Sequence, residues 1–285
     1  MTDSLRLSIT LGYNGTGYAG WARQPELRTV QGDLEEALTH IDPRIGAVVC
    51  AGRTDAGVHA RTQVVHVEGP LDVWVSRTGD GLRRQLNRIT DDRIHVRAVV
   101  AAPPGFDARF SALSRTYSYR ICDDPANWDP LFREWVTLHR KQLDVAAMAR
   151  AAEALVGEHD FAAFCRPREG ASTIRRILRI DVHRDGGRRV VVTVEADAFC
   201  HSMVRSLVGS LVAVGEGRKD VGWVVAKLTA TQRDSTITVM PPQGLVLEAV
   251  TYPPDELLAE RAATTRRFRG AIAESGVEPG DSAVT

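Results

Sequence analysis

The stretch "AVVCAGRTDAGVHARTQVVHV" (47–67) places a compact polar loop between two apolar segments. The segments on either side predict short strands over 45–50 and 62–69. The loop between them contains Gly52, Arg53, Thr54, Asp55, Gly57 and His59. Its glycines permit a sharp backbone bend and the close approach of a bulky group. A carboxylate presented in this way, at Asp55, can act as a nucleophile, an electrostatic stabiliser or a general base.

Two other interpretations of this loop are open. Asp55 could hold an Asx-turn, although Arg53, two residues earlier, is placed to keep the carboxylate ionised. Asp55 could also join His59 and His66 in a His-His-carboxylate metal site. His66, however, lies within an alternating strand, and no second carboxylate or third histidine is close in sequence. We therefore expect no metal.

The chain is long enough for a sizeable core, with 285 residues of which 44% are hydrophobic. This length suggests one large domain or two halves. No apolar run approaches the roughly 18 residues that span a bilayer, and the N-terminus does not resemble a signal peptide. The four cysteines are far apart and include no C-x-x-C pair, so we expect neither a zinc site nor a disulfide framework. These features predict a cytoplasmic protein with no membrane partner.

Positive charge is concentrated in two blocks of the sequence. The formal net charge is zero, which by itself argues against a nucleic-acid binder. Residues 51–120, however, contain 11 basic and 7 acidic residues, and residues 166–205 contain 9 and 5. Two such blocks can face one polyanion. Only three of the 36 basic residues are lysines. Arginine suits bidentate phosphate contacts, although a GC-rich genome also explains the excess.

The rest of the chain mixes strands, hairpins and amphipathic helices. Further strands are predicted over 5–13, 92–102, 115–122 and 244–252, with a hairpin over 173–197. Helices are predicted over 29–41, 76–89, 143–157, 199–215 and 221–229. This mixture predicts an α+β fold with a largely antiparallel sheet. We expect an N-terminal half over 1–105, a C-terminal half over 106–254, and a flexible tail over 255–285 with one short helix.

Two other stretches are dense in polar residues. In "FDARFSALSRTYSY" (106–119), Tyr117 and Tyr119 share one face of a strand, and core packing is the simplest interpretation. In "AFCHSMVRSLVGSL", His201 and Arg205 share a helix face with small residues. Such a face can approach another element closely. Arg205 is therefore expected either in a buried ion pair or as a solvated surface charge.

Taken together, these segments resemble the bacterial tRNA pseudouridine synthase A family. Seven segments look like the motifs of that family, in its order, and span about residues 5–253. They are "YNGTGYAGWARQP", "TVQGDLEEAL", "AGRTDAGVHARTQVVHV", "FDARFSALSRTYSYRI", "LVGEHDFAAFC", "AFCHSMVRSLVGSLVAVG" and "PPQGLVLEAVTYP".

The resemblance implies a pseudouridine synthase fold, with two similar α/β halves around a mixed sheet and the active site in the central cleft. It implies an isomerase that converts uridine to pseudouridine at positions 38, 39 and 40, in the anticodon stem-loop of tRNA. It also implies that the enzyme needs no metal or organic cofactor and works as a homodimer, with tRNA bound across both subunits.

The resemblance carries over to single residues. Asp55 matches the catalytic aspartate, and Arg205 matches the basic residue that pairs with it. Arg53 matches the arginine that helps to extrude the target base, and Tyr117 matches the tyrosine that stacks on the uracil.

Three further polar residues of these motifs, Thr54, His59 and His201, are expected either to contact RNA or to support the site from behind. The sequence also departs from the family at three positions. The family often has His or Asn in place of Ser202, Asn in place of Ser206, and an aromatic residue in place of Val246. These departures concern details of the pocket rather than the reaction.

The chemistry of the residues agrees with this assignment. Isomerisation breaks the N1–C1′ bond, turns the base and joins C5 to C1′. Because C1′ becomes cation-like, as in glycoside cleavage, a carboxylate beside it is required. The uracil must be flipped out of its stem to react, and a tyrosine gives the loose base a face to stack on. Whether Asp55 attacks C1′ or removes a 2′ proton is left open by the sequence.

Three competing functions remain at this point. A tRNA-binding protein or RNA chaperone on the same scaffold would bind without forming product. A metal-dependent hydrolase would use Asp55, His59 and His66, and chelators would inhibit it. The same isomerisation could also act on other uridines or other RNAs.

Overall fold

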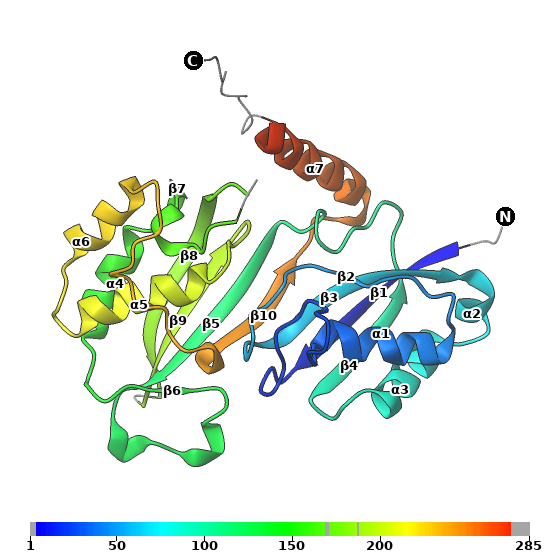
Figure 1. The fold of residues 1–285 in the computed structure, drawn as a ribbon, viewed down its shortest axis with the longest axis horizontal. Coiled ribbons are helices and arrows are strands. Elements are labelled where there is room, and N and C mark those ends of the chain that lie inside the picture. The colour runs from blue at the N-terminus through cyan, green and yellow to red at the C-terminus, as the bar shows by residue number, and fades with distance from the viewer. Residues whose placement is uncertain (1–3, 169–170, 187, 275–285) are drawn as a thin grey trace, which may run out of the picture.

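The computed structural model of the chain describes residues 4–168, 171–186 and 188–274. Figure 1 shows a long sheet with helices gathered near its two ends. The strands are β1 Ser4–Tyr13, β2 Val49–Cys50, β3 His59–Pro70, β4 Ile94–Ala101, β5 Ser114–Cys122, β6 Thr137–Leu138, β7 Gly157–Asp160, β8 Ile174–Asp185, β9 Arg189–Ala196 and β10 Leu245–Thr251. The α-helices are α1 Val30–Ile41, α2 Leu71–Val75, α3 Gly79–Ile89, α4 Val145–Glu153, α5 Met203–Gly215, α6 Val221–Ala226 and α7 Leu258–Glu274.

The described strands form one mixed sheet in the order β4-β1-β3-β10-β5-β9-β8-β7, with β2 added to β3 and β6 to β5. Pairing is antiparallel except between β3 and β10 and between β5 and β6. The sequence prediction of an α+β fold with a largely antiparallel mixed sheet is therefore confirmed.

The centre of the sheet is the parallel pair of β3 and β10. Strands from the first hundred residues lie on one side of it, and strands from residues 114–196 lie on the other (Figure 1). β10 pairs with His59 and Ala60 of β3 on one edge and runs antiparallel to β5 on its other edge. A segment from the end of the chain thus joins the two sets of strands, and the loop that carries Asp55 precedes β3 at this junction.

Local signals in the sequence explain where the helices begin. Thr29 caps α1, as predicted, by accepting a hydrogen bond from the backbone N–H of Gly32. Asp220 caps α6 in the same way. The predicted helix over 199–215 begins only at Met203, because Ser202 has a φ of 63° and breaks the helical path. Every residue of α5 except Arg205 is buried.

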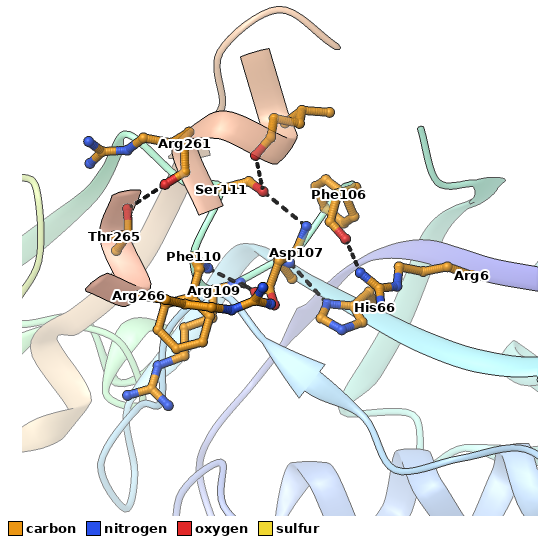
Figure 2. Close-up of polar contacts among 12 residues, drawn as sticks. Arg6, His66, Phe106, Asp107, Arg109, Phe110, Ser111, Arg261, Thr265 and Arg266 are labelled. Carbon is orange, nitrogen blue, oxygen red and sulfur yellow. Dashed lines mark hydrogen bonds and ion pairs between the residues drawn. The ribbon is translucent and has the colours of Figure 1, made fainter. Parts of the chain in front are cut away.

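The end of the described chain is a docked helix. The 17 residues of α7 exceed the short helix that the sequence predicted, and residues 275–285 lie outside the described part of the chain. Figure 2 shows how α7 meets the loop that follows β4. Ser111 Oγ donates to the Leu258 carbonyl (3.0 Å), and the Arg266 guanidinium donates to Asp107 Oδ2 (2.5 Å). Leu258 and Ala262 are buried in this contact.

One expectation about the cysteines was wrong. The structure joins Cys165 and Cys200 in a disulfide with a Cα–Cα distance of 5.7 Å. The sequence did not suggest this because 35 residues separate the two cysteines. The backbone N–H of Arg166 donates to the carbonyl of His201 and so holds the two loops together beside the cysteines. Cys50 and Cys122 are free and buried.

The buried histidine of β3 generates a prediction about stability. His66 Nδ1 accepts the backbone N–H of Ala108 (2.9 Å), as Figure 2 shows. Burial lowers the pKa of His66, and the neighbouring Asp107 opposes this shift. Between the lowered pKa and about 6.5, the unfolded chain binds more protons than the folded protein. The free energy of unfolding should therefore decrease as the pH falls below about 6.5.

Urea unfolding midpoints at pH 5.5 and pH 8 would measure this effect. The His66→Asn variant keeps a hydrogen-bond acceptor for Ala108 but cannot titrate, so its stability should depend less on pH. An equally steep pH dependence in wild type and variant would contradict the assignment.

Candidate active site

Asp55 lies on the loop between β2 and β3 and faces α5 from the other half of the sheet. Arg205 Nη1 is 3.2 Å from Asp55 Oδ2, and Ser202 Oγ donates to the same oxygen at 3.2 Å. His201 Nε2 lies 3.4 Å from the other carboxylate oxygen and forms an ion pair with it when protonated. The carboxylate is thus surrounded by donors on one side and stays partly exposed on the other.

The position of Arg205 is fixed by the close approach of α5 to the segment before β10. Its Nε donates to the Met240 carbonyl at 2.6 Å, and its own carbonyl accepts the Met240 N–H. The small-residue face predicted from the sequence makes this approach possible, because Gly209 lies against the carbonyl of Thr238. Of the two alternatives left open for Arg205, the structure shows the ion pair.

Tyr117 lies in β5 and forms part of the same cavity. The residue is 7% exposed, and its ring meets Phe199 edge-on, with centroids 5.2 Å apart. Burial raises the pKa of Tyr117 well above its usual range, and the charge of Asp55 adds to the shift. The phenol is therefore protonated at neutral pH.

Buried polar contacts hold the Asp55 loop on its side facing the core. Thr54 Oγ1 is hydrogen-bonded to the hydroxyl of Tyr13 (2.8 Å), and Gln63 Nε2 donates to the carbonyl of Gly52 (2.6 Å). Gly57 has a φ of 75°, which explains why glycine stands there. The Thr54 side chain is thus directed into the core, where it supports the loop.

A buried arginine supplies a further support. Arg115 donates to the carbonyls of Ala51, Arg109 and Asp197, and so ties the Asp55 loop to two other segments. Burial lowers the pKa of Arg115. No sequence motif distinguishes this residue, although it lies two positions before Tyr117 on the same strand.

His59 lies behind the loop rather than in the cavity. It is 4% exposed, its Nδ1 accepts the N–H of Gly15, and its Nε2 is 3.2 Å from the Gln243 carbonyl oxygen. Of the two roles left open for His59, this geometry favours structural support. His59 and His66 each bond to different backbone groups, and no metal-binding cluster of His, Cys, Asp or Glu exists among the described residues. Among the described residues, Asp55, His59 and His66 therefore do not form the metal-binding set that a metal-dependent hydrolase would need.

The groups around Asp55 line a cavity of about 560 Å³. Arg53 is an exposed residue of its wall, and no ion pair between Arg53 and Asp55 is found in the described part of the chain. Seven arginines line the cavity: Arg53, Arg109, Arg115, Arg166, Arg168, Arg175 and Arg205. All seven come from the two basic blocks of the sequence, and Asp55 is the only acidic side chain among the lining residues described. The two blocks therefore face one space, as the charge pattern predicted.

Comparison with known proteins places this geometry in a family. A family model described as tRNA pseudouridine synthase matches residues 151–253. The chain is 56% identical to tRNA pseudouridine synthase A of Frankia casuarinae, over 94% of this chain and 97% of that protein. It is 47% identical to the protein of the same name in Streptomyces griseus, over 93% and 94%.

The chain belongs to the tRNA pseudouridine synthase A family. Its fold is the pseudouridine synthase fold. Among solved structures, the archaeal box H/ACA sRNP Nop10–Cbf5 complex is similar, with 10% identity, coverage of 94% of this chain and 56% of that chain, and a TM-score of 0.33. That likeness is too weak to support an argument about the site.

The structure also locates the three departures from the family pattern. Ser202 contacts Asp55 through its hydroxyl, whereas Ser206 and Val246 are buried. Only the first departure therefore touches the carboxylate. Its short side chain reaches Asp55 because Ser202 has left-handed backbone geometry, a feature that the sequence did not predict.

The close approach at Gly209 generates a prediction. A Cβ at Gly209 would lie 1.8 Å from the Thr238 carbonyl oxygen, so Gly209→Ala must push α5 away from residues 238–240. We expect a loss of about 1–3 kcal/mol in the free energy of unfolding. Gly222→Ala is the matched control, because a Cβ there meets only the Asp220 side chain at 3.4 Å. Equal stability of the two variants in urea unfolding would show that the approach is not tight.

Proposed function

We propose that this protein is a tRNA pseudouridine synthase that isomerises uridine at positions 38, 39 and 40 of the anticodon stem-loop. The observation that carries the proposal is the partly exposed carboxylate of Asp55, paired with Arg205 at the base of a cavity lined by arginines. The relatives named tRNA pseudouridine synthase A support the choice of tRNA as substrate.

We assign the bond-breaking step to Asp55. As the N1–C1′ bond breaks, positive charge develops at C1′, and the carboxylate stabilises it directly or after removal of a 2′ proton. Arg205 holds the carboxylate in its charged form and fixes its orientation through its second contact, with Met240. Arg53, exposed on the cavity wall, fills the place of the extruded base or holds a phosphate. His201, next to Asp55, contacts RNA.

Tyr117 supplies the face on which the free uracil stacks and turns, with Phe199 fixing its ring. After C5 joins C1′, the hydrogen on C5 must leave, and N1 gains a proton. Because the pKa of Tyr117 is raised, its phenol acts as a relay: the oxygen accepts the C5 proton while its own hydrogen passes to water or to the Asp55 carboxylate.

The proposed function also bears on cofactors and on the oligomeric state. The steps assigned here need no metal or organic cofactor. We further propose a cytoplasmic homodimer that binds tRNA across both subunits. No helix among the described residues is long and apolar enough to span a membrane.

Release of tritium from unmodified tRNA labelled at uridine C5 tests the proposal. With excess chelator present, wild type should release tritium, whereas Asp55→Asn should release none while binding tRNA within a few-fold of wild type. Binding without release by wild type would identify a tRNA-binding protein or a different target RNA. Full activity of Asp55→Asn would refute the mechanism.

Tyr117→Phe separates stacking from proton transfer. The variant keeps the aromatic face but loses the hydroxyl, so tRNA affinity should be retained and the single-turnover rate should fall by about 10²-fold or more. A rate within threefold of wild type would remove the hydroxyl from the proton relay.

A further inference from the structure

We propose that Arg166, Arg168 and Arg175 form a phosphate-binding subsite on the C-terminal wall of the cavity, where they hold one phosphodiester of the RNA chain next to the flipped nucleotide. The inference rests on the proposed function, because it takes RNA as the ligand. It assigns a task to three arginines that the reaction at Asp55 does not use.

The charges on this wall lack a carboxylate partner among the residues that the structure describes. Of the seven arginines that line the cavity, only Arg205 forms an ion pair with a carboxylate in the described part of the chain. Elsewhere, ion pairs with acidic side chains are common, as between Arg184 and Asp123. The uncompensated arginines are thus concentrated where a polyanion would enter.

Two adjacent residues of β8 show this contrast most clearly. Arg175 lines the cavity and has no carboxylate within ion-pair distance among the described residues. Arg176 is the next residue along the strand, where side chains alternate between faces, and it pairs with Glu158 at 3.1 Å. Charge on the outer face is therefore neutralised, and charge on the cavity face is left free for a ligand.

Arg175 is also the least solvated of the three. Its Nε is buried without a hydrogen-bond partner in the described residues, and only its terminal Nη1 donates, to the carbonyl of Ile174. Burial lowers the pKa of Arg175 against the opposing charges of Asp197 and Asp160. A half-buried guanidinium without a carboxylate at ion-pair distance is unfavourable, and a bound phosphate would relieve this cost through paired N–H···O bonds.

Arg166 connects this wall to the catalytic carboxylate. Its backbone N–H donates to the carbonyl of His201, whose ring faces Asp55. Arg168 is exposed and lines the cavity two residues further on. Arg53, by contrast, belongs to the loop that carries Asp55, so we assign it a separate contact with the RNA.

A double-mutant cycle tests the subsite by combining one substitution in the protein with one uncharged linkage in the RNA. The probes are tRNA anticodon stem-loops with a single uncharged methylphosphonate at each linkage around the target uridine. Their affinities are measured by fluorescence anisotropy in the Asp55→Asn protein, so that the RNA is not converted. Each of the substitutions Arg175→Gln, Arg166→Gln and Arg168→Gln is then added to this Asp55→Asn parent protein. Arg176→Gln is the matched control, because it removes a neighbouring charge that is already paired.

We expect one linkage at which the methylphosphonate weakens binding by about tenfold in the parent and in the control. In Arg175→Gln, the same substitution should have little further effect, because the contact is already lost. The slope of log affinity against log salt concentration should also become shallower by about 0.7–0.9. Should Arg175→Gln not fold, as judged by its melting curve, the Arg166 and Arg168 variants provide the same cycle.

The subsite would be overturned if, at every linkage, the protein substitution and the methylphosphonate weakened RNA binding independently, so that their effects on the binding free energy added up. Failure of the parent protein to bind the RNA would also overturn it. Turnover of the unsubstituted stem-loop by wild type separates the two proposals. If wild type forms pseudouridine but the two substitutions act independently on affinity, only the subsite is rejected. If the two substitutions are coupled but wild type forms no pseudouridine, the proposed isomerase function is rejected and the phosphate site is retained.

Discussion

The ion pair between Asp55 and Arg205 links the two halves of the chain at the point where the parallel pairing of β3 and β10 brings them together. The carboxylate comes from a loop that follows β2, and the guanidinium comes from the first turn of α5, 150 residues later in the chain. Neither group is well placed alone. An unpaired Arg205 would be the one charged group on an otherwise buried helix, and Asp55 without Arg205 would keep only its contacts with Ser202 and His201. The proposed catalysis and the packing of α5 therefore depend on the same contact.

Several other elements of the structure fix the geometry of the ion pair between Asp55 and Arg205. The parallel pairing of β10 with β3 sets the Asp55 loop beside the segment that carries Met240, to which Arg205 is bonded. Gly209 lets α5 approach this segment, and the left-handed geometry of Ser202 starts the helix where its first turn faces the carboxylate. Arg115 anchors the loop from the other side. Small displacements in any of these elements would move the donors away from Asp55.

Much of this arrangement could be predicted from the sequence because its signals are local. Alternating strands, the Thr29 cap and the polar loop around Asp55 all depend on residues close together in the chain. The two basic blocks predicted a common polyanion site, but not which arginines face it, since the choice between Arg175 and Arg176 depends on strand register. Features created by tertiary contact were missed. These include the Cys165–Cys200 disulfide, the bond from Ser202 to Asp55 and the docking of α7.

The limits of motif-based prediction are clearest at His59. An imidazole next to a catalytic loop is a reasonable candidate for contact with substrate, and its residue type gives no information about burial. In the folded chain, both ring nitrogens bond to backbone groups of other loops, and burial lowers the pKa of His59. In the proposed mechanism, the same motif thus supplies a reacting group at Asp55 and a structural support four residues later.

The most direct test of the central role of the ion pair is the single-turnover rate of Arg205→Gln, measured beside its tRNA affinity and its melting temperature, with Arg205→Lys as the charge-conserving control. We expect a folded Arg205→Gln protein that binds tRNA within a few-fold of wild type and isomerises uridine at least about 10²-fold more slowly. Arg205→Lys should recover part of the rate. A folded Arg205→Gln protein with the wild-type rate would show that Asp55 works without its partner, and would contradict the account.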